Sequence, residues 1–148
     1  MRWRSQGRRV VRHVSLVLCP FQLQFRMDRA RFHALVAEAI DEIPEPFRDY
    51  LENVAVVVED EPSDELLREM EMDPRQDTLY GLYEGVPVGE RQFDGAPMLP
   101  DRIIIYYRPL VRDFRTPTAI RREIRTTIIH EVGHVFGLED DEIEAEGY

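Results

Sequence analysis

The sequence contains a single cysteine, Cys19, no lysine, and no apolar run that approaches 18 residues. A lone cysteine excludes a disulfide framework, and it excludes a zinc site built from several thiolates. The lack of a long apolar run argues against a transmembrane helix. At 148 residues the chain is long enough for one domain with a modest hydrophobic core, and too short for a second domain beside it.

Positive charge is scarce outside the first 26 residues. Those residues carry six arginines and no acidic residue, whereas residues 28–148 carry thirteen arginines and all 29 acidic residues, a net charge of −16. An acidic body of this kind disfavours nucleic acids and anionic membranes as partners. It could favour basic peptides, although a solvated acidic surface is the commoner meaning of such a composition. The acidic run at residues 60–65 is interpreted in the same way, as solvated surface and not as a metal site.

Residues 1–26 differ in composition from the rest of the chain. Their basic start and the short apolar stretch VSLVLCPF resemble a signal peptide, but Pro20 interrupts the stretch and no small-x-small cleavage site follows. We therefore interpret residues 1–26 as an N-terminal extension, either disordered or upstream of a true start at Met27, and we expect a cytoplasmic domain at residues 27–148. The alternative, a targeting segment, lacks the cleavage chemistry.

The spacing of apolar residues predicts helices and strands along the rest of the chain. An amphipathic helix with Asp28 as its cap is expected over residues 28–43, and two prolines follow it. Runs of β-branched and apolar residues predict strands. The expected strands are residues 53–59, 79–84 and 102–107, the last ended by Pro109, and the expected short helices are residues 47–51 and 63–71. Residues 88–101, with two glycines and two prolines, are expected to form a loop.

The strongest chemical signal begins at His130, inside a helix expected over residues 116–136 with Thr116 as its cap. His130 and His134 are four residues apart, which on a helix places both imidazoles on one face, about 5.4 Å apart along the axis. Two ring nitrogens at that separation can converge on one Zn²⁺ ion at about 2.1 Å each. Glu131 follows the first histidine and points to the side, where it can act as a general base beside a bound water.

A glycine and several acidic residues follow the second histidine. Gly137 can adopt a positive φ, which ends the helix and turns the chain back toward the histidines. The residues after it offer a third ligand, for which Asp140 is the first choice and Asp141 and Glu142 are alternatives. The whole pattern, H-E-x-x-H-x-x-G-x-x-D, is much rarer by chance than H-E-x-x-H alone. The competing interpretation, an acidic helix end that carries two histidines by coincidence, leaves two imidazoles in a mostly apolar helix without polar partners.

The segment HEVGHVFGLEDD, together with GLYEGVP and DRIIIYYRPL upstream of it, resembles the small bacterial zincin-like metallopeptidase family. The resemblance covers residues 27–148 and implies an α+β fold, in which a small mixed sheet packs against the helix of the motif and an N-terminal helix. It also implies zinc ligands at His130 and His134 and a catalytic glutamate at Glu131. The extended pattern resembles metzincins as well, whose third ligand corresponds to Asp140, although no methionine follows residue 98 to form their methionine turn.

These patterns lead to one hypothesis and one rival. The hypothesis is a zinc metallopeptidase in which His130, His134 and Asp140 bind Zn²⁺ and Glu131 takes a proton from the attacking water. The rival is a non-catalytic zinc-binding or partner-binding module that retains the motif for stability. A retained Glu131 argues against the rival, because a structural metal site needs no base.

The substrate of the hypothetical peptidase is a peptide or a protein. We expect it to lie extended along an exposed edge of the sheet, with residues 79–84 or residues 102–107 as the candidate edge strand. Tyr106, Tyr107 and Tyr148 are candidate hydrogen-bond donors to the developing oxyanion, although a core or surface role is commoner for each.

Overall fold

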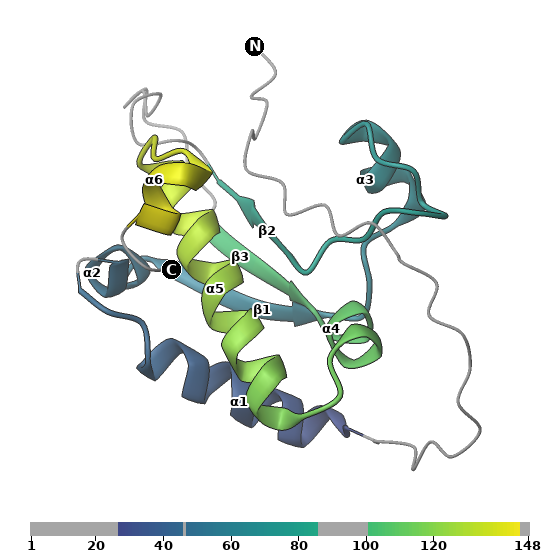
Figure 1. The fold of residues 1–148 in the computed structure, drawn as a ribbon, viewed down its shortest axis with the longest axis horizontal. Coiled ribbons are helices and arrows are strands. Elements are labelled where there is room, and N and C mark those ends of the chain that lie inside the picture. Colours follow the sequence, from purple (N-terminus) through teal and green to yellow (C-terminus); the bar gives the residue numbers. More distant parts are fainter. Residues whose placement is uncertain (1–26, 46, 86–100, 146–148) are drawn as a thin grey trace, which may run out of the picture.

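The structure is a computed structural model that describes residues 27–45, 47–85 and 101–145. It has the predicted α+β arrangement of helices around a small mixed sheet (Figure 1). The elements in chain order are α1 (Arg29–Asp41), α2 (Phe47–Leu51), β1 (Val54–Glu59), α3 (Asp64–Glu69), β2 (Gly81–Glu84), β3 (Asp101–Tyr106), α4 (Tyr107–Asp113), α5 (Pro117–Val135) and α6 (Asp140–Ala145). The predicted extension at residues 1–26 and all but the last residue of the predicted loop at residues 88–101 lie outside the described residues.

Side-chain caps fix where the two longest helices begin, at the residues predicted for this role. Asp28 accepts a hydrogen bond of 2.8 Å from the backbone N–H of Arg31 at the start of α1. Thr116 accepts one of 3.1 Å from the N–H of Ala119, and Pro117 follows it as the first residue of α5. A cap of this kind satisfies an amide that the helix leaves without a partner, and it stabilises the helix by about 1 kcal/mol.

The three strands of the sheet lie in the order β1–β3–β2. β1 runs parallel to β3, and β2 runs antiparallel to it on the other side. β3 is therefore the central strand, with neighbours on both sides. The prediction that residues 102–107 could offer an exposed edge is wrong, because the backbone of β3 is already used for pairing. β2, within the predicted strand at residues 79–84, is at an edge of the sheet.

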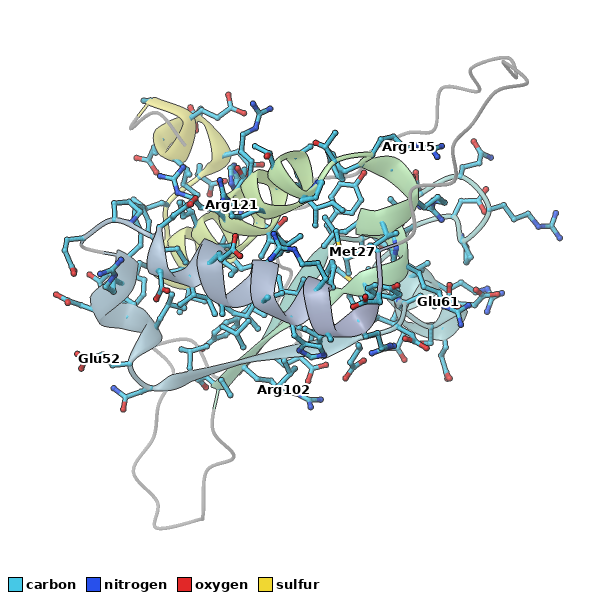
Figure 2. The ribbon with its side chains drawn as sticks, turned by 90° about the horizontal axis from the view of Figure 1, so that it is seen from below. Met27, Glu52, Glu61, Arg102, Arg115 and Arg121 are labelled. Carbon is cyan, nitrogen blue, oxygen red and sulfur yellow. The ribbon has the colours of Figure 1, made fainter. Side chains whose placement is uncertain are left out.

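The side chains in the second half of β3 alternate between two apolar clusters, which explains why residues 103–106 form a continuous apolar run. Ile103 and Ile105 belong to the main core, formed with α1 and α5. Ile104 and Tyr106 belong to a smaller core on the opposite face, with residues of α3 and of the segment before β2. Figure 2 shows α5 on one side of the sheet and the labelled Arg102 on the other. A strand buried on both faces loses the hydrophobic–polar alternation of a half-exposed strand.

Helix α4 directly follows β3 and was not predicted. β3 ends at Tyr106, and Pro109, which was predicted to end the strand, is instead the third residue of α4. A proline is tolerated there because the amides of the first helical turn need no partner within the helix. Leu110 of α4 is fully buried in the main core, and burial of this kind stabilises a fold by about 1.5–3 kcal/mol per side chain. Tertiary packing thus favours a helix where local sequence suggested only the end of a strand.

The first residue of the predicted domain is part of the core. Met27 is 6% exposed, and its backbone carbonyl accepts a hydrogen bond from the hydroxyl of Tyr107 (Figure 2). Tyr107 also packs edge-on against Phe32 of α1, with ring centroids 5.0 Å apart. In the described part of the chain, no helix combines the length and the apolar character that crossing a bilayer requires.

Candidate metal centre

The last turns of α5 carry both histidines of the motif and are fixed firmly to the core. Ile124, Ile128 and Ile129 of this helix are fully buried, and His130 is only 7% exposed. The rings of His130 and His134 lie one turn apart with centroids 6.3 Å from each other. Figure 1 shows this end of α5 beside α6 and near the end of β2, so three elements meet at the motif.

Hydrogen bonds to backbone carbonyls set the tautomer of both histidines. Nδ1 of His130 lies 2.9 Å from the carbonyl oxygen of Thr126, and Nδ1 of His134 lies 2.9 Å from that of Leu138. A carbonyl oxygen only accepts, so each Nδ1 carries a proton, and the tautomer that this favours has its lone pair on Nε2. Nε2 of His134 is buried and has no hydrogen-bond partner. This arrangement, with one nitrogen held by a carbonyl and the other bare, is the usual one for metal-binding histidines.

Gly137 ends α5 in the way its sequence position predicted. Its φ is +79°, a conformation that residues with side chains rarely adopt. The N–H of Gly137 donates to the carbonyl of His134, and the N–H of Leu138 donates to that of Gly133, each at 3.0 Å. These two bonds form a Schellman motif, which satisfies carbonyls at the helix end. The turn also brings the carbonyl of Leu138 onto the ring of His134.

The residues after the turn form helix α6, which was not predicted. The carboxylate of Glu142 accepts a hydrogen bond of 2.9 Å from the N–H of Glu139, which caps the start of the helix. Ile143 is fully buried against Gly133 of α5. A Cβ atom on Gly133 would lie 2.5 Å from Cδ1 of Ile143, so only glycine allows this close approach. The glycine between the two histidines was the sequence signal for this contact.

Helix α6 places Asp140 against the second histidine. Oδ1 of Asp140 lies 3.1 Å from Nε2 of His134, and the Asp140 side chain is half exposed. Two ligand atoms bound to one zinc ion at about 2.0–2.1 Å in a tetrahedral arrangement are roughly 3.3 Å apart. The His134–Asp140 pair therefore fits a shared metal ion. Asp141 is exposed and Glu142 caps α6, so neither competes with Asp140 for the same position.

His130 is less closely placed than this pair. Two imidazoles on one tetrahedral zinc ion have ring centroids roughly 5–5.5 Å apart, and the observed 6.3 Å is longer than that. Within residues 27–45, 47–85 and 101–145, no three histidine, cysteine or acidic side chains converge closely enough to form a ready-made metal site. The donor types are those that zinc prefers, and His134 and Asp140 are spaced to share one ion, whereas His130 lies one turn earlier and farther off than a shared ion requires.

The side chain of Glu131 reaches the edge of the sheet. Its Oε2 accepts a hydrogen bond of 2.9 Å from the backbone N–H of Tyr83 in β2. Burial raises the pKa of the Glu131 carboxyl to about 8, while the Tyr83 N–H lowers it and the negative charge of Asp140 raises it further. Sequence reasoning missed the Tyr83 contact, because the two residues are 48 positions apart.

The tyrosines predicted as oxyanion donors do not lie at the motif. The side chain of Tyr106 packs in the smaller core on the opposite face of the sheet, and burial raises its pKa to about 12. The hydroxyl of Tyr107 donates to the backbone carbonyl of Met27, and this contact belongs to the packing of the residues before α1. Both side chains thus have the commoner role, core packing, because strand alternation and the start of α4 direct them into the apolar clusters. Tyr148 lies outside the described residues.

Comparison with known families gives one match. The family model described as zincin-like metallopeptidase matches residues 51–148, which is more than half of the chain and includes the whole motif. No curated protein matches the sequence.

Proposed function

Since the chain belongs to the zincin-like metallopeptidase family, we propose that it hydrolyses peptide bonds with one zinc ion held by His130, His134 and Asp140. The observation that carries the proposal is the buried, unbonded Nε2 of His134, fixed by the Leu138 carbonyl and facing Asp140 at 3.1 Å. A lone pair in that position, next to a carboxylate that can only accept, is the arrangement that a shared metal cation would stabilise. Zinc supplies that cation, and when bound it polarises the scissile carbonyl and acidifies the attacking water.

Glu131 is the residue that moves the proton in this proposal. Its carboxylate takes a proton from the attacking water and returns it to the leaving amine. A base works best when its pKa lies near the working pH, and burial brings the pKa of Glu131 into that region. The Tyr83 N–H holds Oε2 in place and so orients the carboxylate. The two functions of Glu131, accepting and returning the proton, need no other acidic group.

The edge of β2 is the proposed place for an extended peptide or protein substrate. β2 pairs with β3 on one side, and the N–H of Tyr83 faces Glu131 instead of β3. A Cβ atom on Gly81 would lie 2.6 Å from Cγ2 of Thr127, so α5 closely approaches this strand. A peptide added along this edge gains backbone hydrogen bonds and passes the catalytic glutamate.

The test compares Glu131→Gln with His130→Ala. Glutamine keeps the shape of the side chain and can still accept from Tyr83, so Glu131→Gln should bind zinc and fold normally. Loss of the general base should reduce hydrolysis of a peptide library by about 10²–10⁴-fold. His130→Ala should instead lose zinc, measured by elemental analysis after dialysis. Equal cleavage by wild type and Glu131→Gln would contradict the mechanism, and zinc binding without any cleavage would favour the non-catalytic rival.

A further inference from the structure

A pocket of about 230 Å³ opens beside the end of α5. It lies between α5, α2 and the first residues of β1 and β3, and a water molecule occupies only about 30 Å³. Val132 and Val135 of α5 form part of its apolar wall. Tyr50 of α2 and Phe136 stack across the other side, with ring centroids 3.6 Å apart. The pocket is therefore large enough for a long side chain and has an aromatic face.

The aromatic face is exposed, which is unusual for large apolar side chains. Tyr50 is 40% exposed and Phe136 is 38% exposed, and they are the large hydrophobic side chains with exposed surfaces among the described residues. Because the two rings stack on each other, their exposed apolar surfaces form a single patch. Surface of this kind marks a binding site more often than isolated apolar residues do.

The pocket borders the proposed catalytic site through Tyr83 and α5. Tyr83 is one of the residues that line the pocket, and its backbone N–H holds the carboxylate of Glu131. Val135 lies one helical turn after Glu131 and on the same side of α5. A peptide on the edge of β2 that passes Glu131 can therefore direct a neighbouring side chain into the pocket.

The charge of the pocket selects the kind of side chain. Asp49 and Asp101 contribute carboxylates, and no arginine or histidine is among the described residues that line it. Aromatic faces attract cations, with Arg and Lys stems packing along apolar walls while their charged ends remain near carboxylates.

We propose that this pocket binds the basic side chain of an arginine or lysine in the peptide substrate. The apolar walls would contact the aliphatic stem, the Tyr50–Phe136 stack would face the cation, and Asp49 would provide the opposite charge. The proposal rests on the proposed peptidase function, because the substrate enters along β2. In this proposal, an acidic residue of the chain has a specific role, which is to bind a basic residue of the substrate.

The first experiment compares peptides that contain arginine with otherwise identical peptides that contain citrulline, which replaces the guanidinium by a neutral group of similar shape. Wild type should cleave the arginine peptides with a kcat/KM about tenfold higher, a ratio typical of a cation–π contact reinforced by a carboxylate. Asp49→Asn and Tyr50→Leu should each reduce this ratio toward one. Glu69→Gln, an exposed change on α3, is the matched control and should leave the ratio unchanged. Equal cleavage of arginine and citrulline peptides by wild type would overturn the proposal.

The second experiment measures binding without catalysis, so that the two proposals can fail separately. Nα-acetylarginine amide is titrated into the isotopically labelled protein, with Nα-acetylcitrulline amide as the control ligand. The methyl resonances of Val132 and Val135 should shift with the arginine compound only, and Asp49→Asn should weaken that response. A protein that cleaves no peptide but shows these shifts contradicts the peptidase function and supports the pocket. Absent shifts, or identical shifts with both compounds, contradict the pocket whatever the outcome of the cleavage assay.

Discussion

Replacing Gly133 by alanine should weaken zinc binding although Gly133 contacts no metal ligand atom directly. The new Cβ would lie 2.5 Å from Cδ1 and 3.0 Å from Cγ1 of Ile143, well inside ordinary contact distance. Ile143 is fully buried, so it must move outward and take α6 with it. Asp140 begins that helix, and its 3.1 Å approach to His134 should be lost. Displacing residues that support a metal ligand typically costs 10–100-fold in affinity.

Gly133→Ala should change the stability of the fold less than it changes the affinity for zinc. Overpacking a core costs about 1–3 kcal/mol, whereas replacing glycine by alanine inside a helix returns about 1 kcal/mol. Zinc titration and thermal unfolding of Gly133→Ala would therefore separate a displaced ligand from a misfolded protein. A melting temperature near that of wild type, with a zinc affinity at least tenfold lower, is the expected result.

A second substitution, at Ile143, should relieve the clash that Gly133→Ala creates. Ile143→Val removes Cδ1, the atom nearest to the new methyl group, and by itself should cost only about 0.5–1.5 kcal/mol. Combined with Gly133→Ala, it should restore much of the zinc affinity, a non-additive result that a double-mutant cycle detects. If Gly133→Ala binds zinc as tightly as wild type, or if Ile143→Val restores nothing, α6 does not position Asp140 in the way described.

Three further results are expected. Asp140→Ala should lower zinc affinity at least tenfold and Asp141→Ala should not, and a larger loss at Asp141 in a zinc titration would refute the ligand assignment. In metal-stripped protein, Glu131→Gln should be more stable than wild type by about 3 kcal/mol at pH 7, since Glu131 has a pKa of about 8 in the folded state against 4.5 as its ordinary value. The unfolded chain releases this proton at a lower pH than the folded chain, so wild type should lose stability as pH rises from 4.5 to 8. The extra stability of Glu131→Gln over wild type should therefore disappear below pH 4.5. Urea unfolding in which the stability difference between the two proteins does not change with pH would contradict this assignment. A chain that begins at Met27 should fold and bind zinc like the full chain, whereas aggregation would show that residues 1–26 belong to the domain.

Features that depend on a few neighbouring residues could be read from the sequence. The caps at Asp28 and Thr116 need only an oxygen three residues before an amide, and the structure has both bonds. The turn at Gly137 needs only a residue that tolerates positive φ after a helix, and its φ is +79°. The placement of two histidines on one helical face also follows from the period of the helix. Each of these interactions closes within about one turn of chain.

Features that depend on distant residues were decided by the tertiary structure. The strand at residues 102–107 looked like a candidate edge, but it lies between β1 and β2, because strand order is set by which strands pair and not by their composition. The contact from Tyr83 to Glu131 joins residues 48 positions apart, and it fixes where the candidate base points. Helix α6 depends on Ile143 filling the space that Gly133 leaves open, and this packing brings Asp140 to His134. The sequence by itself thus determined which side chains can do chemistry, while long-range packing decided which of them meet.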